Sequence, residues 1–343
     1  MKNSVWELLK NLEKKEGITE IIVNSPSHIF IERAGDLIRL DINLKSEDIM
    51  SFCVEVAKMN NSSFGPKSPI VDGVLPDGSR INIISPMYTN SGPAITIRKY
   101  LKNIKSFDSL AGEFGITAKW IKFFKTLVWA RKNIIISGGT GNGKTTFMNL
   151  LIQEISKNER IITIEDTREL TVDIPNTIRL LAQKNLHSVE NPLTTRDLLK
   201  NTLRMRPDRI IIGEVRGEEA FDLLQAMNTG HDGSMCTLHS NSPVEALSRL
   251  ENLFLFSGYD LPIRVVRKQV TTALDYIIQL DRNKDGKRIV SQVSEIVNME
   301  GETILTQEIG TAGENGPVFT GLVPQDMASL VENGLNMDFF IDT

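Results

Sequence analysis

The stretch "IIISGGTGNGKTTF", residues 134–147, decides the fold of the larger part of this chain. From Gly138 to Thr145 it fits the pattern G-x-x-x-x-G-K-[ST], with an apolar run before it and a helical pattern after it. Glycines let successive backbone N–H groups converge on phosphate oxygens, and the following helix directs its positive end at the same anion. A glycine-rich turn without a ligand is the alternative, and the lysine and threonine at this spacing argue against it. The stretch therefore predicts a nucleotide-binding phosphate loop.

Within the loop, the pattern assigns separate tasks to two side chains. Lys144 is expected to reach the β- and γ-phosphates of ATP, and the Thr145 hydroxyl is expected to ligate Mg²⁺. The residues predicted to bind the nucleotide are Gly138, Gly139, Thr140, Gly141, Asn142, Gly143, Lys144, Thr145 and Thr146.

Around the loop, apolar segments alternate with helical patterns. We expect strands at 133–137, 160–165, 209–213 and 234–238, and helices at 117–131, 144–157, 194–205 and 218–229. Strands that are apolar throughout and alternate with helices predict an α/β fold with a mainly parallel sheet covered on both faces. A hairpin is expected to turn at Asp285-Gly286.

The first hundred residues have a different pattern, with two short helices and several strands. Hairpin turns are expected at Ala34-Gly35-Asp36 and at Pro76-Asp77-Gly78, which predicts a smaller α+β domain. The predicted organisation is an N-terminal domain at 1–100, a linker at 101–116, an ATPase domain at 117–302 and a tail at 303–343 without an assigned role.

Composition limits the class of protein. The 39 basic and 43 acidic residues give 343 residues a net charge of −4, and only 6% are aromatic, which argues against a nucleic-acid partner. Cys53 and Cys236 are predicted to be buried thiols in a reducing cytosol. The N-terminal stretch lacks the apolar core of a secretory signal, and no apolar run approaches the ~20 residues that span a bilayer. We therefore expect a cytoplasmic protein that reaches a membrane through partners.

Acidic residues follow two of the predicted strands. Glu165, Asp166 and Glu169 come at or after the end of strand 160–165, and Glu214 follows strand 209–213. The carboxyl ends of parallel strands share one edge, so these acids should face the phosphate loop. ATP hydrolysis needs a carboxylate that orients water and another near the metal. We predict that Glu214 does the first task and also supports Mg²⁺, and that Glu165 shares the carboxylate work. Asp166 has an equally good interpretation as a helix cap.

Two of the four histidines flank one predicted strand, in "TGHDGSMCTLH". His239 follows the strand and is expected at the nucleotide edge, where it would sense the γ-phosphate or form a hydrogen bond between subunits. His231 precedes the strand, and we also assign it to nucleotide binding. A metal pair is disfavoured because the spacing of eight matches no common ligand arrangement. His28 and His187 are interpreted as structural.

These motifs together resemble those of the type II/IV secretion ATPase superfamily. The stretches that match its Walker A, Asp box, Walker B and His box motifs are "SGGTGNGKTT", "ITIEDTREL" and "LRMRPDRIIIGEVRGEEAFDLLQAMNTGHDGSMCTLHSNSP". The stretches "LPDGSRINI", "GPAITIRKY" and "VSEIVNMEGE" are similar to the CpaF/TadA branch, the ATPases of tight-adherence (Tad) pili. The resemblance covers about residues 17–302.

The resemblance implies a ring of six subunits, each with a PAS-like N-terminal domain and a RecA-like motor domain. It also implies that arginines of the N-terminal domain complete the ATP site, and Arg80 and Arg98 match that motif, whereas either alone would be interpreted as a surface residue. Arg204, Arg206 and Arg216 are weaker matches. Such a motor would act on inner-membrane platform proteins and power the assembly of a Tad-like pilus or secretion.

The chain also departs from the pattern of that family. Asn142 stands where serine or alanine is more usual, which the backbone cradle should tolerate, and the loop "AQKNLHSVENPLT" lacks the usual motif. Three alternatives stay open: a traffic ATPase of type IV secretion, a RecA-like motor on nucleic acid, and a non-catalytic assembly subunit gated by ATP.

Overall fold

A computed structural model of the chain divides it into two compact units, with the boundary between Asn103 and Ile104. The residues that the structure describes are 4–13, 15, 17–33, 36–99, 106–107, 113–182, 192–258, 261–313 and 316–340. The predicted turn at Ala34-Gly35, most of the predicted linker, His187 and most of its loop lie outside the described residues.

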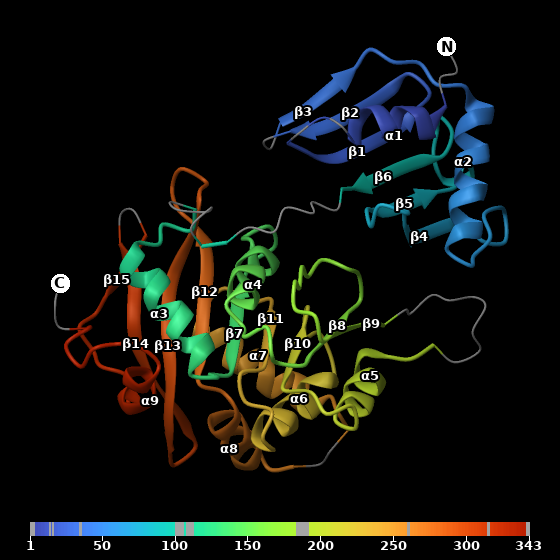
Figure 1. Cartoon of the computed structure of the whole chain (residues 1–343). Helices are drawn as coiled ribbons and strands as arrows, with labels where there is room; N and C mark the ends of the chain where they lie inside the picture. The colour runs from blue at the N-terminus through green and yellow to red at the C-terminus, as the bar shows by residue number, and fades with distance from the viewer. Residues whose placement is uncertain are drawn as a thin grey trace. The chain divides into compact units, whose positions relative to one another are not determined.

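The first unit contains one antiparallel sheet of six strands in the order β3-β2-β1-β6-β5-β4 (Figure 1). Its elements are α1 (Val5–Glu13), β1 (Ile18–Ser25), β2 (His28–Arg33), β3 (Asp36–Leu40), α2 (Ser46–Met59), β4 (Ile70–Val74), β5 (Arg80–Ile84), η1 (Pro86–Tyr88) and β6 (Ala94–Arg98). Buried and open positions alternate along β5 and β6, because only one face of the sheet is covered, by α1 and α2. The turn predicted at 76–78 is confirmed, and Gly78 provides its positive φ of 92°.

The second unit contains a sheet of nine strands in the order β15-β14-β13-β12-β7-β11-β10-β8-β9. Its first elements are α3 (Ala118–Trp129), β7 (Ile134–Gly138), α4 (Lys144–Gln153), β8 (Ile161–Glu165), β9 (Thr177–Leu181), α5 (Thr195–Thr202), β10 (Arg209–Ile212) and α6 (Glu219–Asn228). The elements that follow are β11 (Met235–Leu238), α7 (Pro243–Leu255), α8 (Ile263–Ala273), β12 (Tyr276–Arg282), β13 (Arg288–Glu300), β14 (Thr303–Gly313), β15 (Gly316–Phe319) and α9 (Met327–Glu332).

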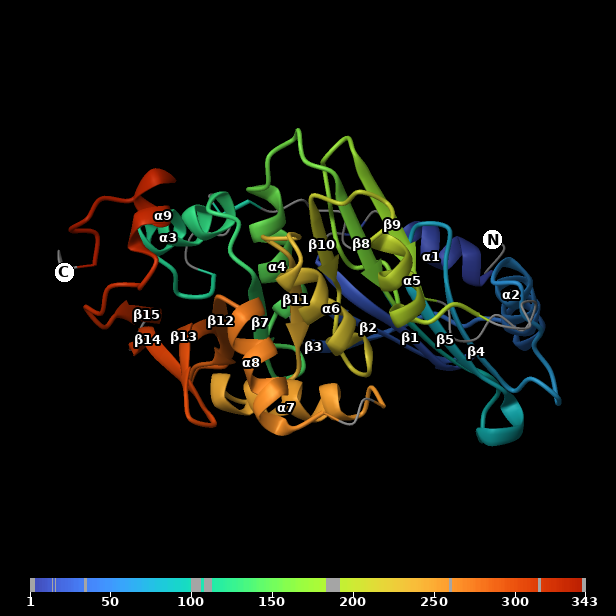
Figure 2. The ribbon, with the colours of Figure 1, turned by 90° about the horizontal axis from the view of Figure 1, so that it is seen from below.

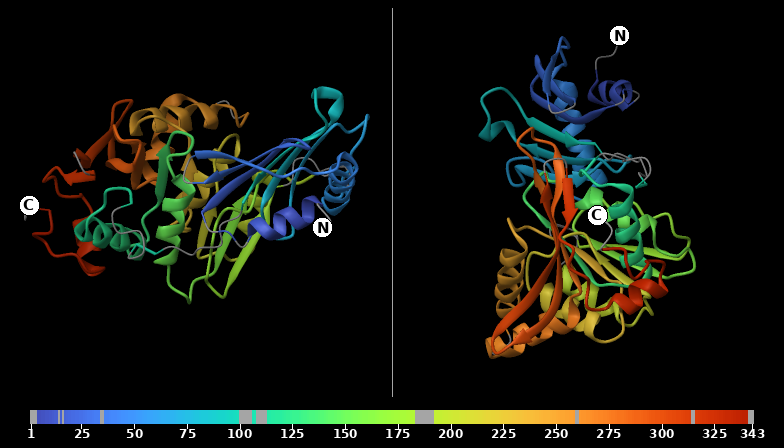
Figure 3. Two further views of the ribbon diagram at one scale, coloured as in Figure 1. Left: turned by 90° about the horizontal axis from the view of Figure 1, so that it is seen from above. Right: turned by 90° about the vertical axis from the view of Figure 1, so that its left-hand side faces the viewer.

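Helices cover both faces of this second sheet, as the right-hand view of Figure 3 shows. Ile134 and Ile136 of β7 face a core that includes residues of α3 and α4, whereas Ile135 faces the core beneath α5–α8. The strands from β12 to β9 are parallel, and β7, β8, β10 and β11 are buried along their whole length. The predicted α/β fold with a mainly parallel sheet and a smaller preceding α+β domain is confirmed.

The sheet continues past residue 302, where the sequence suggested the end of the ATPase domain. β14 and β15 add two antiparallel strands, and the segment beyond them packs on α3 (Figure 2). Trp120 of α3 stacks on Phe319 at 3.7 Å between ring centroids, and its Nε1–H donates to the Pro317 carbonyl at 2.7 Å. Phe107 and Phe114, from the stretch predicted as a linker, are also buried in this core.

The hairpin predicted at Asp285-Gly286 is confirmed, because β12 and β13 are antiparallel neighbours around Gly286. Cys53 and Cys236 are buried free thiols, and burial raises the pKa of each to about 12. Within the described ranges, no helix combines the length and the apolar character that crossing a membrane requires.

Candidate active site

The phosphate loop joins the end of β7 to the start of α4, in the middle of the sheet. Gly138, Gly141 and Gly143 have φ values of 156°, 78° and 88°, in the region that favours glycine. A Cβ atom at Gly138 would lie 2.6 Å from the Leu280 carbonyl oxygen, so this position also requires glycine for space. The loop therefore has the backbone that close approach to a phosphate group requires.

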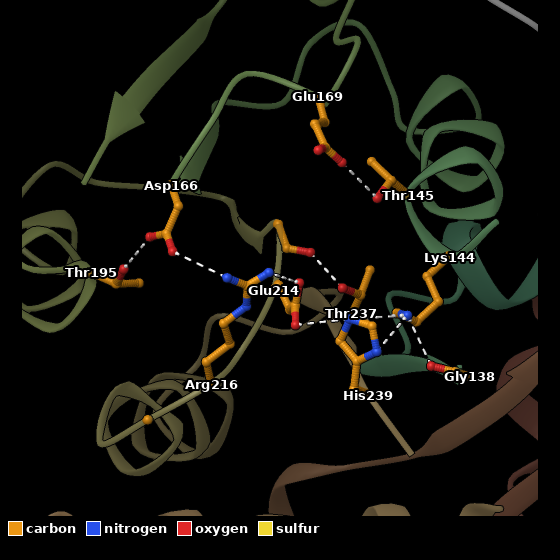
Figure 4. Close-up of polar contacts among 12 residues, drawn as sticks. Gly138, Lys144, Thr145, Asp166, Glu169, Thr195, Glu214, Arg216, Thr237 and His239 are labelled. Atoms are coloured by element: carbon orange, nitrogen blue, oxygen red, sulfur yellow. Dashed lines mark hydrogen bonds and ion pairs between the residues drawn. The ribbon is translucent and has the colours of Figure 1, made fainter. Parts of the chain in front are cut away.

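Lys144 lies at the first position of α4, and its side chain folds back over the loop (Figure 4). The ammonium group donates to the carbonyl oxygens of Gly138 and Gly139, at 2.9 Å each, and lies 3.2 Å from Nδ1 of His239. Burial lowers the pKa of Lys144, and the Glu214 carboxylate opposes that change. Neutral loop carbonyls are partners that an ammonium group exchanges for phosphate oxygens.

Three other loop side chains have distinct surroundings. Thr140 is exposed at the tip of the loop, and Thr146 is half-buried in the first turn of α4. Asn142 is buried, and its Nδ2 donates to the Leu280 carbonyl of β12 at 3.0 Å. Asn142 therefore has a structural role of its own, because its side chain connects the loop to the neighbouring strand.

Thr145, the expected metal ligand, lies beside an acidic residue from the loop after β8. Its hydroxyl donates to Oε2 of Glu169 at 3.2 Å (Figure 4). A hydroxyl and a carboxylate oxygen side by side are hard ligands of the kind that Mg²⁺ prefers, so this pair fits the metal that accompanies ATP. Glu169 was expected to face the phosphate loop, but its pairing with Thr145 was not predicted.

Glu214 follows β10 and lies between Arg216 and His239. Its Oε2 accepts a hydrogen bond from Nη2 of Arg216 at 2.6 Å, and Nε2 of His239 lies 3.1 Å from Oε1. Burial alone would raise the pKa of Glu214, but the hydrogen bond from Arg216, the neighbouring His239 and the positive charges of Arg216 and Lys144 lower it overall. The carboxylate is therefore ionised at neutral pH, as a group that orients water must be.

His239 bridges Lys144 and Glu214. Burial and the nearby Lys144 ammonium lower the pKa of His239, so the ring is neutral at neutral pH. A neutral ring with its proton on Nε2 donates to Glu214 and accepts from Lys144 through Nδ1, which satisfies both contacts. The sequence-based expectation placed His239 at this edge, and the structure brings it there.

Glu165 ends β8 with its carboxylate almost fully buried, at 3% exposure. Its Oε1 accepts from the backbone N–H groups of Glu169 and Leu170 at 2.8 and 2.7 Å, and its Oε2 has no hydrogen-bond partner among the described residues. Burial raises the pKa of Glu165, against the effect of the two N–H donors. A Cβ at Gly213 would lie 3.1 Å from its Cγ, so Glu165 packs directly beside the strand that leads to Glu214.

His231 lies at the amino ends of the parallel strands, opposite to the phosphate loop. It precedes β11, whereas His239 follows it, and β11 is parallel to β7 and β10. Its Nδ1 lies 3.1 Å from the Ala226 carbonyl at the end of α6. The structure therefore does not bring His231 to the phosphate loop, because a short strand separates its two flanking residues onto opposite edges of the sheet.

The predicted arginines fall into two groups. Arg216 lies in the site, with Nη1 at 3.9 Å from Oδ2 of Asp166 as well as its bond to Glu214 (Figure 4). Asp166 also accepts from the Thr195 hydroxyl, at the start of α5, at 3.2 Å. Arg204 and Arg206 lie between α5 and the start of β10, at the end of that strand opposite to Glu214.

Arg80 and Arg98 belong to the first unit, where they are directly opposite each other on β5 and β6. The side chains of directly opposite residues project from the same face of a sheet. Arg80 and Arg98 therefore project from the face opposite to the one that α1 and α2 cover. Their part in the ATP site stays a prediction.

Residues 6–319 match the family model described as "Type II/IV secretion system protein", and the chain belongs to this family. It is 35% identical over 288 residues to the conjugal transfer protein TrbB of Rhizobium radiobacter, covering 83% of this chain and 84% of TrbB. It is 30% identical over 319 residues to the protein VirB11 of Agrobacterium fabrum, covering 83% of this chain and 91% of VirB11.

Among solved structures, a crystal structure of the pilus retraction motor PilT with bound ADP is similar at a TM-score of 0.61 and 19% identity. The similarity covers 98% of this chain and 92% of PilT, and it supports the fold. Members of the family are ATPases, and the phosphate loop of this chain has the geometry described above. The protein is therefore an ATPase of the type II/IV secretion superfamily.

Proposed function

We propose that the protein is a Mg²⁺-dependent ATP-hydrolysing motor that drives a pilus-assembly or secretion machine from the cytoplasmic side of the inner membrane. The observation that carries this proposal is the chain of contacts from Lys144 through His239 to Glu214 at the mouth of the phosphate loop. A site that only bound nucleotide would have no need of an ionised carboxylate connected to the phosphate-binding lysine.

In this proposal, backbone N–H groups from Gly138 to Thr146 and the Lys144 ammonium hold the phosphates. The Thr145 hydroxyl ligates Mg²⁺, which would supply charge neutralisation at the phosphates, and Glu169 and Glu214 are its nearby carboxylates. Glu214 also orients the attacking water, because Arg216 and His239 fix both of its oxygens. Glu165 provides a further carboxylate, which is almost fully buried.

The contacts of His239 suggest how the nucleotide is sensed. Lys144 must leave the Gly138 and Gly139 carbonyls to reach phosphate oxygens, and its departure takes away the hydrogen bond to Nδ1 of His239. The ring is then free to reorient, and its other contact, to Glu214, changes with it. The γ-phosphate and the position of the catalytic carboxylate are thus coupled.

We further propose that six subunits form a ring, that Arg80 and Arg98 complete the ATP site, and that the motor acts through membrane platform proteins. The "LPDGSRINI" and "GPAITIRKY" motifs favour a Tad-like pilus as the machine. The relative TrbB favours the second candidate, a type IV secretion ATPase, because TrbB is named for conjugal transfer. Deleting the gene and then imaging pili and assaying secretion separates the two, since loss of pili with intact secretion supports only the first.

Substitution of the loop lysine tests the proposed activity. We expect Lys144→Ala to reduce Mg²⁺-dependent ATP turnover at least about 100-fold, because the residue contacts the phosphates on which charge develops. Lys157→Ala is the matched control, since Lys157 follows α4 and forms an exposed pair with Asp173 at 2.9 Å. Phosphate release by purified protein measures both variants. Normal turnover in Lys144→Ala would refute the proposed site.

A further inference from the structure

The hairpin between β12 and β13 lies against the phosphate loop. β12 is parallel to β7 up to the pair Leu280 and Gly138, so the chain after Leu280 continues beside the loop. The hairpin tip is closed by hydrogen bonds between Asn283 and Lys287 and turns at Gly286, whose φ is 76°. The tip is thus a compact structure, held in place by the sheet at its base.

Two arginines of this hairpin converge on one carbonyl oxygen of the loop. Nη2 of Arg282 donates to the Gly141 oxygen at 2.9 Å, and Nε of Arg288 donates to the same oxygen at 3.1 Å. Arg282 also donates through Nη1 to the Gly286 carbonyl at 2.7 Å, which fixes its guanidinium between loop and hairpin tip. With the bond from Asn142 to Leu280, three hydrogen bonds connect this hairpin to two consecutive loop residues.

These bonds set the direction in which a loop amide points. The peptide between Gly141 and Asn142 is planar and trans, so its C=O and N–H point in opposite directions. Because the arginines hold the Gly141 carbonyl on the hairpin side, the Asn142 N–H points away from the hairpin, where it donates to the Gly139 carbonyl at 3.4 Å. Backbone N–H groups are the groups with which a phosphate loop binds its ligand, and a contact of 3.4 Å is long enough to be exchanged for one with phosphate.

The arginines also bring positive charge to the loop. Two guanidinium groups that share one neutral oxygen repel each other, and a nearby anion relieves that repulsion. In the described part of the chain, no carboxylate forms an ion pair with Arg282. Gly143 contributes to the close fit, because a Cβ there would lie 3.0 Å from Cδ of Arg288 and 3.1 Å from the Phe114 ring.

We propose that the β12–β13 hairpin positions the phosphate loop for nucleotide, with Arg282 and Arg288 as positioning residues that act through Gly141. They set the affinity for the nucleoside phosphate and leave the rate of the hydrolysis step unchanged. This inference rests on the nucleotide site proposed above and assigns a role to residues outside every motif that identified that site.

Removal of both guanidinium groups tests the inference. We expect Arg282→Ala/Arg288→Ala to raise the KM for ATP and the Kd for ADP about tenfold, the effect of losing charge-assisted hydrogen bonds, with kcat within about twofold of wild type. Lys284→Ala is the control, because it removes a positive charge from the same exposed hairpin tip without a bond to the loop. Steady-state kinetics and calorimetric titration with ADP give the three quantities.

A second variant keeps the test decisive if the alanine variant does not fold. Arg282→Lys/Arg288→Lys retains both charges but not the fork with which Arg282 bridges Gly141 and Gly286, so its KM should lie between those of wild type and the alanine variant. An unchanged KM in a folded variant overturns the inference. So does an equal effect of Lys284→Ala, or a loss of kcat with KM unchanged. The ADP titration requires no hydrolysis, so it still tests the hairpin if the proposed motor activity fails.

Discussion

The parallel strands of the nine-stranded sheet begin at one edge, the amino edge, and end at another, the carboxyl edge. Both of these edges carry buried charged side chains, but the charges have different kinds of partner. At the amino edge, Arg209 is 2% exposed and forms two bonds with Glu159, from Nε at 2.7 Å and from Nη2 at 3.0 Å. Arg131 donates to the same carboxylate at 2.7 Å. These are ion pairs between opposite charges, and they are complete without a ligand.

At the carboxyl edge the charges are held by weaker or shared partners. Lys144 is bound to neutral carbonyls, and Glu214 shares its two oxygens between Arg216 and His239. Glu165 has one buried oxygen without a partner among the described residues. The amino edge therefore contributes to stability, whereas the carboxyl edge keeps its charges in arrangements that a ligand can change.

The largest expected effect that separates the two edges comes from Glu214→Gln. We expect ATP turnover to fall about 10²–10⁴-fold, because the amide cannot orient water as a carboxylate does. ATP binding and thermal stability should stay near those of wild type. Turnover assays and nucleotide titration measure the two effects. Loss of ATP binding instead would show that Glu214 mainly supports the metal.

Substitution at the amino edge should have the reverse outcome. Arg209→Met leaves the half-buried Glu159 with one cation fewer, and we expect a loss of about 3 kcal/mol in the free energy of unfolding. Activity per folded molecule should be unchanged. Urea denaturation followed by circular dichroism gives the free energy, with the exposed pair of Lys157 and Asp173 as a control that should contribute below about 1 kcal/mol. Equal losses of stability at both pairs would show that the ion pair at the amino edge is no more stabilising than an exposed one.

The smallest expected effect is a gain in stability at the carboxyl edge. Burial raises the folded-state pKa of Glu165, so this group favours the folded state below the unfolded pKa, and that contribution is lost as pH rises through the folded pKa. Glu165→Gln removes the buried charge, and we expect it to raise the melting temperature at pH 8 by about 2–4 °C, equivalent to about 1 kcal/mol.

Melting curves across pH give the check on Glu165. The advantage of Glu165→Gln should shrink as pH falls toward 4, since the wild-type carboxyl group is then protonated as well. A variant that is less stable at every pH would mean that the two N–H donors, at 2.7 and 2.8 Å, outweigh the burial.

Much of the second unit was predictable from local sequence, because buried parallel strands are apolar throughout and the loop motif fixes one strand and one helix. The convergence of Glu165, Glu214 and His239 followed from a single rule, that parallel strands end at one edge. The same rule, applied to β11, shows why His231 was misplaced. It comes before the strand, and four residues of strand separate it from the edge that holds His239.

Contacts between segments distant in sequence were not predictable. No local pattern indicates that Arg282 and Arg288 reach Gly141, or that Thr145 meets Glu169, because these contacts depend on the register of neighbouring strands and on loop paths. The strands after residue 302 were missed because β14 alternates only weakly, with mostly exposed or half-buried positions over its first half. Such a strand depends on its neighbour for its structure.

The position of β14 has a practical consequence for any shortened form of the protein. A chain that ends near residue 302 keeps every nucleotide-site motif but leaves the 13-residue β13 as a bare sheet edge. It also removes Phe319 and the Pro317 carbonyl from Trp120. Long unpaired edges recruit strands from other molecules, so such a truncated ATPase would be expected to aggregate, and its failure to hydrolyse ATP would say nothing about catalysis.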